Sequence, residues 1–252
     1  MVGVSTGAVG YRKKIMLKNK AIIFDLGGVL LDEPERNLTK GLPFASLGIP
    51  DSAGNVRIFN RLFEFAQLFY GDVDCKKMWL MGTLSSNKIV QKVKEYIDLP
   101  EHYSFFKDSN ERNLIKYGAE HILISVQLAE LTELNPQGIA FVQRCKQQGI
   151  RCLVLSNWDP ESFELIKHKF PKLFSLFDEK DIFIPANLGF MKPEAQAFEK
   201  VINKAGLDKS TTLFIDDSPM NVVGAQMCNI HAVYHREWGE TEKMVKQIGL
   251  EL

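Results

Sequence analysis

The sequence predicts an α/β fold, a doubly wound, Rossmann-like parallel sheet joined to a mostly helical segment. Short apolar runs that end in a small polar or charged residue recur along the chain, and helical patterns follow them. Such strand–helix alternation is typical of a parallel sheet covered on both faces. One run stands alone at 21–25 and the others begin after residue 149, with few strand-like runs between them. The helical segment is therefore predicted to be inserted after the first strand.

The first strand is predicted at 21–25, where four apolar residues precede Asp25. Prolines and glycines interrupt 33–55, which indicates a connection with short helices at most. Helices are then expected from Val56 onward, around Met78, at 88–97 and at about 119–131.

The second half of the chain alternates between predicted helices and strands. Asn135 precedes a proline, as a capping residue does at a helix start, and Gly149 and Gly206 are placed to end helices. The expected helices are 136–148, 159–170, 193–205 and 218–227, and the expected strands are 150–155, 181–184, 212–215 and 232–234.

These elements divide the chain into an α/β core, 16–33 and 135–252, and a helical cap, 34–134. Residues 1–15 are expected to be a disordered leader. Its positive charges follow the weakly apolar stretch, whereas a secretory signal has them first.

Composition excludes several function classes. The 252 residues contain 31 basic and 31 acidic side chains, so bulk charge indicates neither a nucleic-acid partner nor an acidic membrane. No apolar run approaches the ~20 residues of a membrane span. The four cysteines form no CxxC pair and no zinc-binding spacing. Reduced thiols in a cytoplasmic protein are expected, with Cys152 and Cys228 in the core.

Chemistry-bearing side chains stand where predicted strands end or helices begin. They are Asp25, Ser156 with Asn157, Lys192, and Asp216 with Asp217. Functional groups gather at the carboxyl ends of the strands in an open parallel sheet. An acid, a hydroxyl, a lysine and an acid pair together suit phosphoryl transfer through a carboxylate nucleophile with a divalent metal.

Four motifs in order carry a resemblance to a known family. They read Phe24-Asp25-Leu26-Gly27-Gly28-Val29, Leu155-Ser156-Asn157, Lys192-Pro193-Glu194, and Asp216-Asp217 with Asn221. The chain resembles the haloacid dehalogenase (HAD) superfamily, specifically members with a helical cap inserted after the first strand. Within it, the pattern looks like that of small-molecule phosphatases.

The resemblance implies a role for each motif. Asp25 is the expected nucleophile, Ser156 and the Asn157 backbone N–H would bind phosphate oxygens, and Lys192 would neutralise the developing charge. Mg²⁺ is the expected cofactor, with Asp25, the Gly27 carbonyl, Asp216 and Asp217 as the metal site.

Two supporting roles are also expected. Asp217 would act through a metal-bound water or by orienting Lys192, and Asn221 would support Lys192 or Asp217.

Gly27 departs from the family pattern. Many phosphatases of the family carry a second aspartate there, which serves as general acid and base, a function typically worth ~10²–10⁴ in rate. Glycine keeps the carbonyl for the metal and loses the acid. Asp32, seven residues after Asp25, is one candidate substitute.

The predicted function is Mg²⁺-dependent hydrolysis of small phosphorylated metabolites, sugar phosphates first, through an aspartyl phosphate. The alternative is a non-catalytic or regulatory HAD-like protein that binds a phosphorylated ligand. A dehalogenase is disfavoured by the Asp216–Asp217 pair. A phosphonatase needs a cap lysine, and none of Lys76, Lys77 and Lys88 stands out. Monomer and homodimer both stay open.

Substrate contacts are expected from the cap and the 33–45 linker. The aromatic residues of that region are expected to be mostly core, and Trp158 is the better candidate for the pocket mouth. The aromatic residues are Phe44, Phe65, Phe69, Tyr70 and Trp79.

Overall fold

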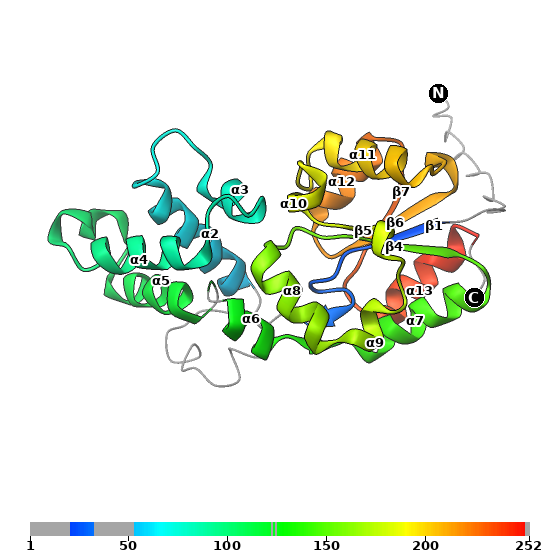
Figure 1. Cartoon of the computed structure of the whole chain (residues 1–252), viewed down its shortest axis with the longest axis horizontal. Coiled ribbons are helices and arrows are strands. Elements are labelled where there is room, and N and C mark those ends of the chain that lie inside the picture. The colour runs from blue at the N-terminus through cyan, green and yellow to red at the C-terminus, as the bar shows by residue number, and fades with distance from the viewer. Residues whose placement is uncertain (1–20, 33–52, 122, 124, 250–252) are drawn as a thin grey trace, which may run out of the picture.

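A computed structural model describes residues 21–32, 53–121, 123 and 125–249 (Figure 1). Five strands form one parallel sheet in the order β5–β4–β1–β6–β7. They are β1 (Ala21–Phe24), β4 (Arg151–Leu155), β5 (Ile182–Phe183), β6 (Thr212–Asp216) and β7 (His231–Tyr234). The predicted α/β class with a parallel sheet is confirmed. The predicted leader, residues 33–52 of the predicted 33–55 connection, and Phe44 lie outside the described residues; residues 53–55 belong to helix α2 (Ala53–Gln67).

Side chains of β1 alternate between two hydrophobic cores, one on each face of the sheet. Ile22 and Phe24 belong to one core, and Ala21 and Ile23 to the other. Figure 1 shows α11 and α12 on one side of the sheet, and α7 and α13 on the other. The helices of the first core are α7 (Pro136–Gln147), α8 (Pro160–Lys169), α9 (Pro171–Phe174) and α13 (Trp238–Gln247); those of the second are α10 (Pro185–Leu188), α11 (Ala195–Ala205) and α12 (Pro219–Met227).

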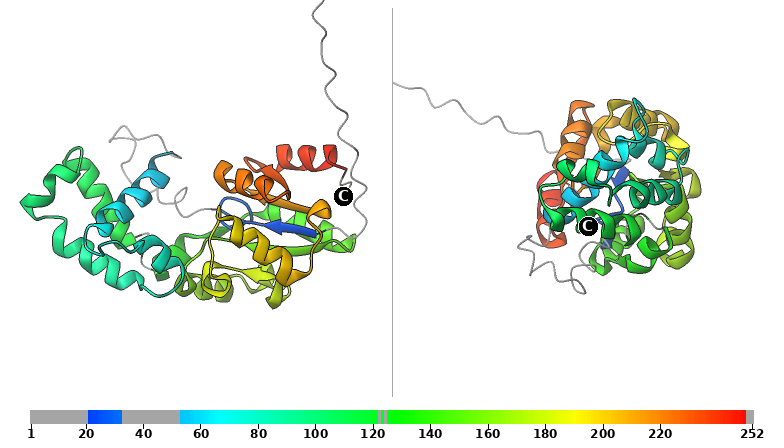
Figure 2. Two further views of the ribbon diagram at one scale, coloured as in Figure 1. Left: turned by 90° about the horizontal axis from the view of Figure 1, so that it is seen from above. Right: turned by 90° about the vertical axis from the view of Figure 1, so that its left-hand side faces the viewer.

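Within the described residues 53–121, four helices form a separate helical unit, seen beside the sheet in Figure 2. They are α2 (Ala53–Gln67), α3 (Cys75–Leu80), α4 (Ser86–Tyr96) and α5 (Ser109–His121), with a 3₁₀ turn at Pro100–Phe105. The unit has its own hydrophobic cluster, in which Phe65, Trp79 and Ile89 are buried. Helix α6 (Ser125–Leu131) packs on α8 instead, and its Leu128 belongs to a sheet core. The domain borders 33/34 and 134/135 stay a prediction.

Several predicted boundaries were wrong. The helix expected at about 119–131 is two helices, α5 and α6, and the helix expected from Pro193 begins at Ala195. Helix α13 and the two-stranded ribbon of β2 (Leu31–Asp32) and β3 (Glu133–Leu134) were not predicted. Two-residue strands have no periodicity to detect, and α13 buries little apolar surface besides Trp238 and Val245.

All four cysteines are buried and unpaired in the structure, Cys152 and Cys228 in the sheet cores as predicted. Among the described residues, no helix has the length and apolar character needed to cross a membrane.

Candidate functional site

The polar residues at the ends of β1, β4 and β6 lie together because β1 pairs with both β4 and β6. Asp25 follows β1 directly, and its backbone N–H donates to the Ile215 carbonyl (3.0 Å). Asp216 is the last residue of β6, and Ser156 follows β4. The chain leaves β1 toward β4 and later returns on its other side as β6, so these residues stand at a topological switch point, the usual ligand site of such sheets.

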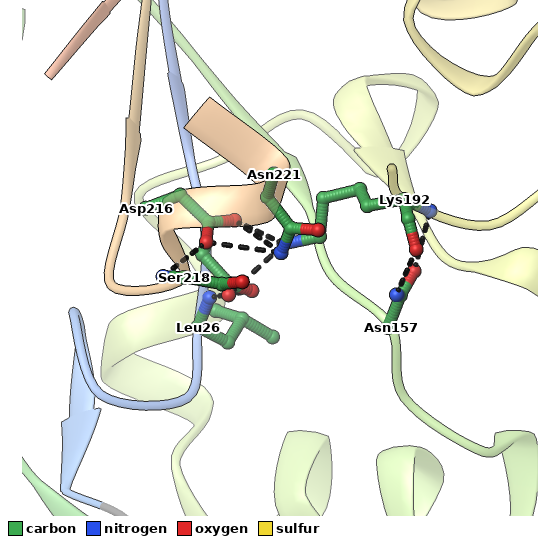
Figure 3. A network of polar contacts seen from close by, with 7 residues as sticks. Leu26, Asn157, Lys192, Asp216, Ser218 and Asn221 are labelled. Carbon is green, nitrogen blue, oxygen red and sulfur yellow. Dashed lines mark hydrogen bonds and ion pairs between the residues drawn. The ribbon is translucent and has the colours of Figure 1, made fainter. Parts of the chain in front are cut away.

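Lys192 lies in the segment between α10 and α11 and is 1% exposed. Its Nζ lies 2.6 Å from Oδ2 of Asp216 (Figure 3). The same Nζ lies 2.9 Å from Oδ2 of Asp25. One buried cation therefore bridges the carboxylates at the ends of β1 and β6.

Asn157 holds the backbone of Lys192 from both sides. The Lys192 backbone N–H donates to Oδ1 of Asn157 (2.9 Å), and Nδ2 of Asn157 donates to the Lys192 carbonyl (2.7 Å) (Figure 3). Only the backbone N–H of Asn157 was predicted to act at the site, and this role of its side chain was not predicted. The two residues are 35 positions apart, so no local pattern could reveal the pair.

Asp216 is fully buried and receives hydrogen bonds from three directions. Besides Lys192, the Ser218 backbone N–H donates to its Oδ1 (2.8 Å), and Nδ2 of Asn221 donates to both carboxylate oxygens (3.0 and 3.1 Å). Asn221 was predicted to support Lys192 or Asp217, but its side-chain amide donates to Asp216 instead. These donors fix the carboxylate orientation of Asp216.

Three carboxylates form a cluster suited to a cation. Asp25, Asp216 and Asp217 each offer an oxygen, and these oxygens lie within 4.8 Å of one another. Hard oxygen donors of this kind fit Mg²⁺. Gly28 has a φ of +69°, and a Cβ there would collide with Oδ2 of Asp217. Glycine thus lets the Asp217 carboxylate approach the β1 loop.

Gly27, the remaining predicted metal residue, forms an isolated bridge with Leu31. The hydrogen bonds of that bridge are Leu31 N–H to Leu26 O and Gly28 N–H to Leu31 O, both 2.8 Å. Neither uses the Gly27 carbonyl, so the bridge is compatible with the predicted metal role.

The three carboxylates of the cluster carry more negative charge than the Lys192 ammonium can balance. The pKa of Asp25 is raised to about 7, chiefly by burial; the charges of Asp216 and Asp217 also raise it, and Lys192 opposes the shift. Burial opposes the charge of Lys192, but Asp216 and Asp25 outweigh burial and raise its pKa above the ordinary value. Lys192 is therefore protonated at neutral pH, and a divalent cation would favour ionised Asp25.

Other predicted site residues have different surroundings. Ser156 is 2% exposed at the end of β4, beside Asn157. The Asp32 carboxylate accepts a hydrogen bond from Nδ2 of Asn135 (3.0 Å) at the β2–β3 ribbon. The role of Asp32 as general acid stays a prediction. Trp158, expected at the pocket mouth, is buried in a sheet core and donates to Ser162 (2.8 Å). Phe65 and Trp79 are core, as expected.

Comparisons with known proteins agree with this geometry. Residues 19–229 match the family model of haloacid dehalogenase-like hydrolases. A HAD family enzyme from Bacteroides thetaiotaomicron, solved with magnesium and inorganic phosphate, is 17% identical, with a TM-score of 0.54 over 89% of this chain and 99% of that one. A HAD phosphatase from Thermococcus onnurineus is 18% identical, with a TM-score of 0.52 over 90% and 97%. A dehalogenase is 15% identical, with a TM-score of 0.51 over 92% and 98%. At these identities the structures share the fold, and the chemistry must be argued from the site.

Proposed function

The chain belongs to the haloacid dehalogenase-like hydrolases, and from this premise we propose that it is a Mg²⁺-dependent phosphatase. Its proposed substrates are small phosphorylated metabolites, with sugar phosphates first. The observation that carries the proposal is the buried Lys192 between Asp25 and Asp216, with Asp217 completing an acid cluster. The enzyme with magnesium and phosphate and the Thermococcus onnurineus phosphatase are related examples that support it.

Asp25 is the proposed nucleophile. The Leu26 backbone N–H donates to its Oδ1 (2.7 Å), and Lys192 contacts its Oδ2 (2.9 Å), so the carboxylate has a defined orientation. A carboxylate oxygen forms a bond to phosphorus while the ester P–O bond breaks, and the leaving alkoxide departs with that electron pair. Water then attacks the aspartyl phosphate, releasing phosphate and restoring the Asp25 carboxylate.

Lys192 and the loop after β4 would stabilise the transferring group. Positioning and charge stabilisation are the main protein contributions to phosphoryl transfer. The Lys192 ammonium faces Asp25, and Ser156 with the Asn157 N–H would bind phosphate oxygens. Mg²⁺ held by Asp25, the Gly27 carbonyl, Asp216 and Asp217 would supply further charge neutralisation.

Gly27 shapes the proposed substrate range. No carboxyl side chain stands at that position, so the leaving alkoxide takes its proton from water unless another acid replaces it. Esters with acidic leaving groups, such as p-nitrophenyl phosphate, should therefore be turned over faster than alkyl esters.

The first experiment measures phosphate release from p-nitrophenyl phosphate and a panel of sugar phosphates and nucleotides, with Mg²⁺ and with EDTA. Asp25→Asn runs beside the wild type. We expect Mg²⁺-dependent release that Asp25→Asn abolishes, and the panel then ranks the substrates.

Absence of release from every compound would contradict the phosphatase and favour a HAD-like protein that binds a phosphorylated ligand, the alternative that Gly27 leaves open. Release that EDTA does not affect would contradict the metal dependence alone.

A further inference from the structure

Helix α3 of the helical unit carries Lys77, whose ammonium group reaches the sheet unit, the part of the chain that forms the parallel sheet and its covering helices. Nζ of Lys77 lies 2.6 Å from Oε1 of Glu194, and the two side chains are 39% and 30% exposed. The start of α3 is capped by Asp74, whose side chain accepts the Lys77 backbone N–H (2.9 Å). Lys77 therefore extends from the first turn of a capped helix toward a residue far along the chain.

Glu194 closes the turn that carries Lys192. Its backbone N–H donates to the Met191 carbonyl (2.9 Å), and its Oε2 accepts the Met191 N–H (3.4 Å). The Met191 side chain packs against the hydrophobic cluster of the helical unit. Both ends of the turn 191–194 thus contact the helical unit, while Lys192 within it contacts Asp25 and Asp216.

A second contact joins Gly82, just after the end of α3, to the start of α8, which follows the β4 loop of the site. A Cβ on Gly82 would lie 2.7 Å from Cγ of Pro160, so the two residues are in close approach. Pro160 begins α8 three residues after Asn157, whose amide holds the backbone of Lys192. The segment 75–84 therefore rests against both loops that position Lys192.

We propose that Lys77 and Glu194 are positioning residues for the reaction, tying the helical unit to the turn that carries Lys192. This proposal rests on the phosphatase function above. With the pair formed, the turn has contacts on both sides, and the Lys192 ammonium stays within hydrogen-bond distance of Asp25. Without it, the Glu194 end of the turn loses its contact with the helical unit, while the Met191 packing and the Asn157 hydrogen bonds remain. Small misplacements of a charge-stabilising group then slow transfer.

The test compares Lys77→Met, Glu194→Gln and the charge-reversed double variant Lys77→Glu/Glu194→Lys. Lys76→Met is the matched control, because Lys76 is next on the same helix and its Nζ bonds Asn60 within the helical unit (3.1 Å). Steady-state hydrolysis of p-nitrophenyl phosphate with Mg²⁺ and thermal unfolding are measured for each protein.

We expect each single variant to lower kcat about three- to tenfold with a smaller change in KM and an unchanged melting temperature. The double variant restores an ion pair but removes the Glu194 oxygen that accepts the Met191 N–H, so it should recover part of the lost kcat. Lys76→Met should match the wild type. Single variants that equal the control would overturn the proposal.

A second readout does not need catalysis. Spin labels on cysteines introduced at Asp72 and Asn203, both exposed and on different units, report the distance between the units. We expect Lys77→Met to broaden or lengthen the wild-type distance distribution. If the wild type hydrolyses nothing, the phosphatase proposal fails by itself. In that case, a spin-label distance distribution that is unchanged in Lys77→Met would contradict the proposed link between the two units.

Discussion

At the scale of single residues, the site is built from a few hydrogen bonds and ion pairs between polar groups. Asp25, Lys192 and Asp216 were predicted from their positions at the ends of elements, and the structure brings them together. Two contacts were not predictable in this way. Asn157 bonds a backbone 35 positions away, and Asn221 bonds Asp216 where Lys192 or Asp217 was expected. Local sequence indicates which residues carry chemistry; folding decides their partners.

Gly28 provides a test at this scale. Gly28→Ala should displace the Asp217 carboxylate, because the added Cβ meets Oδ2 of that residue. We expect Mg²⁺ affinity to fall about tenfold, the lower end for lost support of a metal ligand. Isothermal titration with Mg²⁺ measures this change.

The control for that substitution is Gly71→Ala. Gly71 has a similar φ of +66°, but a Cβ there meets nothing within 4 Å. It therefore adds the backbone strain of a positive φ without the collision. Equal losses of Mg²⁺ affinity in the two variants would contradict a specific role of Gly28.

The charge of Asp25 predicts a pH dependence. Without metal, its pKa is about 7 when folded and close to 3.8 when unfolded, so the folded protein binds an extra proton between these values. Metal-free stability should therefore fall as pH rises through this window, and stabilisation by Mg²⁺ should be larger at pH 8 than at pH 5. Urea unfolding with EDTA and with Mg²⁺ measures both, and Asp25→Asn should weaken the dependence. An identical pH profile in Asp25→Asn would rule out this assignment.

At the scale of elements, the helix start that the sequence predicted at Asn135 is confirmed. The Asn135 side chain accepts the Gly138 N–H (2.9 Å), as the capping signal predicted. Helix α13 was missed because its sequence is mostly polar, and burial of Trp238 against α7 becomes visible only in the fold. The break between α5 and α6 was also missed, and these helices pack on different cores.

The packing of α7 on α13 and the β1 loop can be tested at Gly138. Alanine is ordinarily the better helix former by ~1 kcal/mol. A Cβ at Gly138 would lie 2.9 Å from the Val29 carbonyl and 3.0 Å from the Trp238 ring. Gly138→Ala should therefore destabilise the protein by about 1–3 kcal/mol. Chemical unfolding measures this.

The control in α13 is Gly239→Ala, where the nearest atom lies at 3.7 Å. That substitution should leave stability unchanged or raise it. A stabilised Gly138→Ala protein would show that this packing is not tight.

At the scale of the whole molecule, the chain passes from the helical unit back to the sheet through α6, which packs on α8. Helix α6 is fastened to the sheet unit by Lys169 of α8, whose Nζ donates to the carbonyls of Ala129 (2.8 Å), Glu130 (2.7 Å) and Thr132 (2.9 Å). A lysine at a helix C-terminus interacts favourably with the helix dipole. The end of α6 is thus fixed on the sheet side of the molecule.

Lys169→Met should remove this attachment and lower the free energy of unfolding by about 1 kcal/mol. It should also speed hydrogen exchange in α6, which mass spectrometry resolves. Lys180→Met is the control, because that lysine is 74% exposed and lies 3.9 Å from Asp178. Equal exchange rates in the two variants would show that Lys169 does not hold α6.

The sequence by itself determined the α/β class, the order of the main strands along the chain and the polar residues that the fold brings together. These features depend on apolar periodicity and on polar residues at the ends of elements, which are local properties of the chain. Only the tertiary structure decided which side chains meet. Asn157 with Lys192, Asn221 with Asp216, and Lys77 with Glu194 pair residues from different segments of the chain, and the pairs arise from how those segments pack.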